Sequence, residues 1–90
     1  MTKRLVTYTI QEEKARLAFG AEIHGIDANC IDVISGHAIY FESDKNLDEL
    51  FQILSATGID GSVDEFFIFT VTNSGFGIGM KTVLERLKRE

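Results

Sequence analysis

Proline and tryptophan are absent from this chain of 90 residues, and cysteine occurs once. The lack of proline excludes stiff extended linkers and proline-rich ligand segments. The single cysteine, Cys30, cannot form an internal disulfide, which favours a reducing compartment, so we expect a cytoplasmic protein. No apolar run is long enough to cross a bilayer, and the first residues lack the apolar core of a secretion signal, so we expect no membrane contact.

Basic side chains are scarce in the middle of the chain. Between Leu17 and Met80 the only lysine or arginine is Lys45, against ten aspartates and glutamates, and the formal net charge is −5. This segregation gives a folded protein a negative field that repels the nucleic acid backbone and attracts basic patches on other proteins. We therefore expect a partner protein with a basic surface, and no direct nucleic acid ligand.

The acidic residues have two interpretations. Carboxylates are stabilised in the first turn of a helix and bond nearby backbone in loops, so many of them could be caps and turns. An ordinary solvated surface mixes both signs of charge, however, and the missing lysines favour a patch that docks onto a cationic surface. The predicted partner-binding residues are Glu42, Asp44, Asp48, Glu49, Asp60, Asp64 and Glu65.

The length fits one domain, residues 1–90. Alternation of apolar residues predicts a strand over residues 4–10, and residues 30–41 are typical of a hairpin in which Ser35-Gly36 is the turn and Ile34 pairs with His37. A helix over 46–57 has an apolar stripe and a capping pair, Asn46 and Glu49. A strongly apolar strand follows over 66–72, which we expect to be central in the sheet, and a second helix over 81–89.

Residues 12–25 are ambiguous between helix and strand. Thr9 and Glu12 have the spacing of a capping box, which favours a helix. Leu17, Phe19 and the next alternate residues are apolar, which favours a strand, and glycines weaken a helix here. With a strand, the chain is an α+β domain with a small, largely antiparallel sheet and two or three helices mainly on one face. With a helix, the order becomes the ferredoxin-like β-α-β-β-α-β plus a C-terminal helix.

A glycine-rich segment follows the last strand and precedes the last predicted helix. Phosphate-binding loops use this context, because exposed backbone amides and a helix N-terminus attract anions. Here Met80 precedes Lys81 where a phosphate loop needs glycine, so a nucleotide or anion site is the alternative interpretation and not the leading one. The candidate site is the loop from Gly75 to Lys81, together with Ser74 just before it. Its candidate ligand-binding residues are Ser74, Gly75, Gly77, Gly79 and Lys81.

No catalytic motif is specific enough to name a reaction, and we expect no cofactor and no metal. Residues of metal-ligand type cluster within 24–37, but their spacing matches no zinc pattern; they are His24, Asp27, Cys30, Asp32 and His37. A ferredoxin-like endoribonuclease, similar to the small nucleases of CRISPR adaptation, is a third alternative. Those enzymes end their first strand with a metal-binding aspartate, and Thr9 stands at that position here.

Both faces of the predicted hairpin are apolar, although two helices usually cover only one face of a small sheet. Residues Ile31, Val33, Ala38 and Tyr40 form the second face and predict a homodimer, or burial against a larger partner. Size and charge together predict a non-enzymatic protein-binding module. Its most concrete form is an inhibitor that occupies the nucleic-acid-binding channel of another protein, by analogy with anti-defence proteins of phages and mobile elements.

Overall fold

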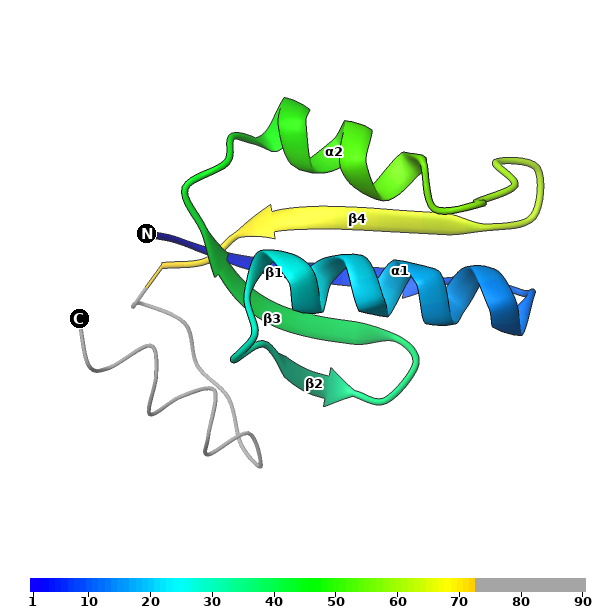
Figure 1. Cartoon of the computed structure of the whole chain (residues 1–90), viewed down its shortest axis with the longest axis horizontal. Helices are drawn as coiled ribbons and strands as arrows, with labels where there is room; N and C mark the ends of the chain where they lie inside the picture. Colours follow the sequence, from blue (N-terminus) through cyan, green and yellow to red (C-terminus); the bar gives the residue numbers. More distant parts are fainter. Residues whose placement is uncertain (73–90) are drawn as a thin grey trace.

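The computed structural model describes residues 1–72, which form a four-stranded antiparallel sheet and two helices (Figure 1). The elements are β1 (Thr2–Thr9), α1 (Glu13–Ile26), β2 (Ile31–Ile34), β3 (Ala38–Ser43), α2 (Leu47–Ser55) and β4 (Glu65–Thr70). The predicted α+β class is confirmed, and the order of elements is that of the ferredoxin-like alternative. The predictions for residues 73–90, including the glycine-rich site and the last helix, lie outside the described residues.

The sheet is built around β1, which pairs with β3 on one side and β4 on the other, in the order β2-β3-β1-β4. The expectation that the most apolar strand is central was therefore wrong, because β4 lies at an edge. The central strand carries Arg4, Val6 and Tyr8 on one face, and that face is buried. The hydrophobicity of a strand did not identify the central strand of the sheet, because part of the apolar surface of β4 is exposed and not buried.

Both helices cover the same face of the sheet. Val6 pairs with Ile39 on β3 and Ile68 on β4, so these side chains point to one side. The rings of Tyr8 and Phe19 lie 4.8 Å apart between centroids. One continuous core results, and its buried residues are Val6, Tyr8, Ile10, Ala15, Phe19, Ile23, Ile39, Phe41, Leu50 and Leu54.

Residues 13–26 form a helix, so the strand favoured by alternation was wrong. In the helix Ala15, Phe19 and Ile23 recur every four residues and are all buried, whereas Leu17 is 64% exposed. The predicted capping box is not formed, because the helix begins at Glu13 and its N-cap, Glu12, makes no side-chain cap bond. The glycines cost the helix about 1 kcal/mol each relative to alanine. Burial of the Phe19 and Ile23 side chains stabilises it by more, at about 1.5–3 kcal/mol each.

The hairpin between β2 and β3 forms with a different register from the predicted one. Ile34 pairs with Ala38, not His37, and the register is irregular between Asp32 and Ile34. The His37 amide donates a hydrogen bond of 2.9 Å to the Ile34 carbonyl, and Gly36 has a φ of 77°. A third loop residue is accommodated because glycine adopts this left-handed conformation without steric cost.

The capping of α2 is as predicted. The Asn46 side chain accepts a hydrogen bond of 2.9 Å from the Glu49 amide, and the Glu49 carboxylate accepts one of 3.3 Å from the Asn46 amide. Leu50 and Leu54 are fully buried, and Gly58 follows the helix with a φ of 92°. The signals for this helix are local, which is why the sequence located it well.

The helical stripe of α1 can be tested with two substitutions on the same helix. We expect Phe19→Ala to lower the free energy of unfolding by about 3–5 kcal/mol, since it leaves a cavity in the core. Leu17→Ala should change it by less than about 0.5 kcal/mol, because Leu17 faces solvent. Urea unfolding measures both. If Phe19→Ala does not fold, Ile23→Val should cost about 0.5–1.5 kcal/mol. Equal effects at positions 17 and 19 would instead indicate a strand.

Candidate functional site

The predicted acidic patch is divided between two ends of the molecule. Ser43, next to Glu42, pairs with Thr2 at the start of β1, whereas Glu65 pairs with Thr9 at its end. The two positions are seven residues apart along the strand, or roughly 23 Å. We call the first group the acidic end: Glu42, Asp44, Asp48 and Glu49, joined by Glu22 of α1. The second group comprises Asp60, Asp64 and Glu65.

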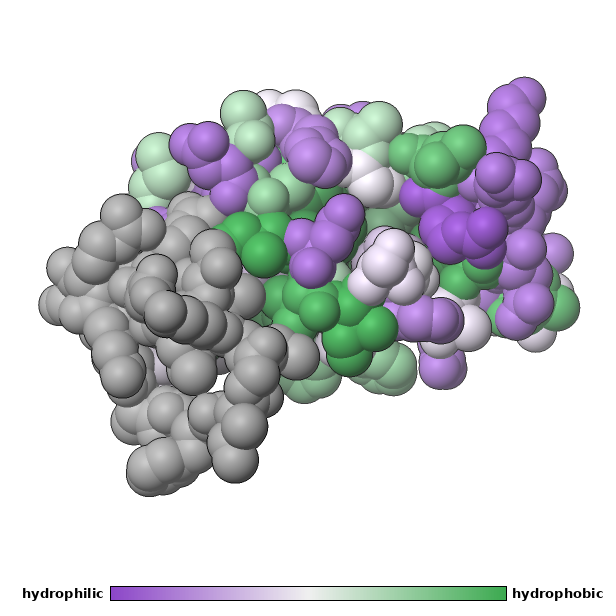
Figure 2. Space-filling model, turned by 90° about the horizontal axis from the view of Figure 1, so that it is seen from below, coloured by the Kyte–Doolittle hydropathy of each residue, from purple (hydrophilic) through white to green (hydrophobic). Residues whose placement is uncertain are grey.

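The second group closes the loop between α2 and β4. Asp64 accepts hydrogen bonds from the Gln11 amide at 2.8 Å and from the Asp60 amide at 2.9 Å. Asp60 accepts bonds from the Ser62 amide and hydroxyl, at 3.0 and 2.7 Å, and these bonds lower the pKa of its carboxyl. Hydrophilic residues crowd at this end, on the right in Figure 2, beside an apolar region in the middle. These aspartates therefore have a local structural role.

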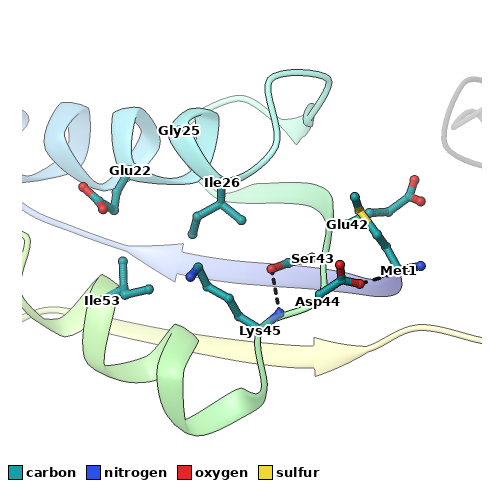
Figure 3. A pocket seen from close by; sticks show the side chains of 9 residues that line it. All are labelled: Met1, Glu22, Gly25, Ile26, Glu42, Ser43, Asp44, Lys45 and Ile53. Carbon is teal, nitrogen blue, oxygen red and sulfur yellow. Dashed lines mark hydrogen bonds and ion pairs between the residues drawn. The ribbon is translucent and has the colours of Figure 1, made fainter.

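The acidic end includes part of the lining of a pocket of about 540 Å³ between α1, α2 and the loop from β3 to α2 (Figure 3). Three acidic residues line it: Glu22 of α1, Asp44 in the loop, and Glu42 of β3, whose carboxylate turns to the other face of the sheet and accepts a hydrogen bond from the Tyr40 hydroxyl. The amine of Met1 lies 4.0 Å from Asp44. The remaining residues that line the pocket are Met1, Gly25, Ile26, Ser43, Lys45 and Ile53.

Lys45 extends its side chain into this pocket, with the ammonium group between Ile26 and Ile53 (Figure 3). The pocket also lies at the C-terminal end of α1, where the helix dipole is negative. Isoleucine walls suit the aliphatic stem of a lysine or arginine, and carboxylates at the rim suit its charged head. The lining of the pocket thus suits a cationic side chain, such as the one that Lys45 already places there.

Asp27 ties α1 to the strand that carries Glu42. One carboxylate oxygen accepts a hydrogen bond of 2.9 Å from the Asn29 amide, and the other accepts one of 2.9 Å from the Glu42 amide. Asp27 is also the residue that follows the last turn of α1. Sequence reasoning missed this role because the loop bond to Asn29 is local but the bond to β3 spans fifteen residues.

Arg4 is buried beneath the same end, with 7% of its surface exposed. Its guanidinium donates to the Thr70 hydroxyl and, at 3.3 Å, to the Lys45 carbonyl, so it joins β1, β4 and the loop that holds Asp44. Its Nε atom is buried without a hydrogen-bond partner in the described part of the chain. The sequence indicated only a terminal cation at this position.

The metal-type residues of 24–37 do not gather: within residues 1–72 no group of three or more His, Cys, Asp or Glu side chains could hold a metal ion. Thr9, where a nuclease would need an acid, ends β1 and is exposed. On the second face of the sheet, Ala38 and Tyr40 are buried. The Tyr40 hydroxyl donates a hydrogen bond of 3.2 Å to the Glu42 carboxylate. Ile31 and Val33 are partly buried, but the irregular register places Ile34, and not Val33, opposite Ala38, so the predicted face was wrong at this position.

Comparison with known protein families, curated proteins and solved structures found no match for this chain. Among residues 1–72, neither helix has the length and apolar character that crossing a membrane requires. The site must therefore be interpreted from its own geometry. That geometry separates four predicted acidic residues, of which Glu42 and Asp44 line a pocket, from three at the far end of the molecule.

One buried titratable group gives a test of pH dependence. Burial raises the pKa of Tyr8, and the Asp32 carboxylate raises it further, with a smaller opposing effect of Arg16. A phenol with a raised pKa stabilises the fold below the pKa of the unfolded chain, about 10, and this stability is lost as pH rises through the folded value. We expect Tyr8→Phe to lose less stability than the wild type between pH 9 and 11 in urea unfolding. If the wild type and Tyr8→Phe lost equal stability over this pH range, ionisation of Tyr8 would not contribute to the pH dependence.

Proposed function

We propose that this domain is a non-enzymatic protein-binding module whose acidic end docks onto a basic site of a partner protein. The observation that carries the proposal is the pocket between α1 and α2, whose lining includes three acidic residues, Glu22, Glu42 and Asp44. Asp48 and Glu49, in the first turn of α2, extend the negative surface beyond it. The three carboxylates at the other end are not included, since two of them close a loop.

Docking would begin with long-range attraction, because a net charge of −5 steers the chain toward cationic surfaces. An arginine or lysine of the partner would then enter the pocket and displace the ammonium group of Lys45. The stem would contact Ile26 and Ile53, while the head would bond to the carboxylates at the rim. Each carboxylate hydrogen bond to a cation is stronger than a neutral one, so the pocket supplies specificity as well as charge.

Basic sites on proteins are often channels for nucleic acid. A small acidic domain seated in such a channel would block it, so inhibition of a nucleic-acid-binding protein is the concrete form of the proposal, of the kind that phage and mobile-element anti-defence proteins provide. A cytoplasmic location accords with this role and with the single cysteine.

The role of the acidic end can be tested with two variants of equal net charge. The first carries Glu22→Gln, Asp44→Asn and Asp48→Asn at the acidic end. The second carries Glu12→Gln, Glu13→Gln and Glu65→Gln at the opposite end, all exposed. Binding of a fluorescent oligo-arginine peptide is measured by anisotropy at low and at high salt. We expect the first variant to bind about tenfold more weakly, from three contacts of about 0.5 kcal/mol each.

The second variant should bind nearly as well as the wild type, and binding should weaken in high salt because exposed charges are screened. Equal losses in the two variants would show that net charge, and not the acidic end, attracts the peptide. Binding that is indifferent to salt would contradict an electrostatic mechanism altogether.

A further inference from the structure

The edge strand β4 has hydrogen-bonding groups that point away from the sheet. Among the strands of residues 1–72, β1 is the one that pairs with it. The Val71 amide donates a hydrogen bond of 2.9 Å to the Lys3 carbonyl. Because backbone groups alternate in direction along a strand, the amides and carbonyls of Val71, Phe69 and Phe67 face β1. The backbone amides and carbonyls of Phe66, Ile68 and Thr70 consequently face outward.

Between Phe66 and Thr70 this edge lacks the sequence features that usually prevent strands from pairing. Natural edge strands are blunted by lysines, prolines, inward charges or bulges. From Phe66 to Thr70 the strand is uncharged, and its register with β1 is regular over all six paired residues. Phe67 and Phe69 lie on the face opposite the helices and are 56% and 50% exposed. An apolar, regular edge of this kind is a template for another strand.

We propose that two copies of the chain associate by antiparallel pairing of their β4 strands, with the two-fold axis at Ile68. In this register Ile68 lies opposite its own copy and Phe66 lies opposite Thr70, so each outward backbone group meets a partner. On the open face, Phe67 of each copy lies opposite Phe69 of the other. Aromatic cross-strand pairs of this kind stabilise a sheet by about 0.2–1 kcal/mol each.

The edge is complementary to itself at this register, which is why we infer a second copy as the occupant. Each copy carries a net charge of −5, so two copies repel one another, and this repulsion is least where no charges meet directly and salt screens the rest. β4 supplies such a contact, and its single charged residue, Glu65, comes opposite Val71 and not opposite another acid. Val71 in turn neighbours Lys3 across the sheet. The register that satisfies the backbone therefore also avoids a like-charge contact.

The predicted dimer is weak. A phenylalanine buries about 150–250 Å², so the exposed halves of four rings contribute about 400 Å² to the contact. The paired backbones and flanking side chains add to this, yet the total stays below the roughly 1,600 Å² of a standard stable interface. Association should therefore depend on concentration. The proposal is independent of the acidic end, which lies on other residues.

Cross-linking tests the register directly. Residues opposite each other at a position without ladder hydrogen bonds have Cα atoms about 4.5 Å apart, which suits a disulfide. We expect the double variant Phe67→Cys/Phe69→Cys to form a disulfide-linked dimer under mild oxidation. Phe67→Cys alone and Phe69→Cys alone are matched controls, because neither position faces itself across the axis. Equal cross-linking in the single variants, or none in the double variant, would overturn this register.

Sedimentation across a dilution series tests the association itself. We expect a monomer–dimer equilibrium for the wild type, and a dissociation constant raised about tenfold or more by Phe69→Lys, since a charge then enters the contact. Ile34→Lys is the control, because Ile34 is 52% exposed on the same face but belongs to β2. Unfolding curves for both variants verify that they fold. A wild type that is monomeric at every concentration, or a dimer weakened only by Ile34→Lys, would overturn the proposal.

Discussion

The structure depends on the packing of one face of β1 against the two helices. Val6 and Tyr8 are the centre of that face, and Phe19, Leu50 and Leu54 cover it with no exposed surface of their own. A domain of this size buries only about two thirds of the surface of its unfolded chain, so it can complete one such core and not two. The surfaces that we propose for binding therefore lie outside this core, at the ends of the strands and along the edge strand β4.

The electrostatics follow from that arrangement. Carboxylates cannot enter the core without partners, and they lie where helices and strands end. At one end the carboxylates of Asp60 and Asp64 accept hydrogen bonds from backbone amides and so close the loop between α2 and β4. At the other end Asp27 and Arg4 already fix the backbone of β3 and of the following loop, which leaves Glu22 and Asp44 at the pocket. The buried guanidinium of Arg4 thus holds in place the loop that carries Asp44 at the acidic end.

The sequence predicted those elements whose signals are local. The capping pair of α2 and the turn glycine of the hairpin act within a few residues, and both elements form where they were expected, apart from one residue of register. Residues 13–26 were different, because Leu17, Phe19 and Ile23 fit a period of two as well as part of a helical stripe. Only the core decides between them, by accepting Phe19 and excluding Leu17. The acidic patch was divided for the same reason: closeness along the chain does not say at which end of a strand a residue lies.

The two proposed surfaces are compatible in one molecule. Arg4 pairs with Thr70 at the end of β4 and also holds the Lys45 carbonyl, so the acidic end lies at the Thr70 end of the strand. Antiparallel pairing of two β4 strands places these ends at opposite extremes of the paired edge. The dimer would then present two acidic ends that do not compete for one partner molecule. A partner with two basic sites at a matching distance would bind such a dimer more tightly than one copy, because the second contact forms at a high effective concentration. Weak self-association and weak electrostatic docking would in that case reinforce each other, since occupancy of both sites would favour the dimer by mass action.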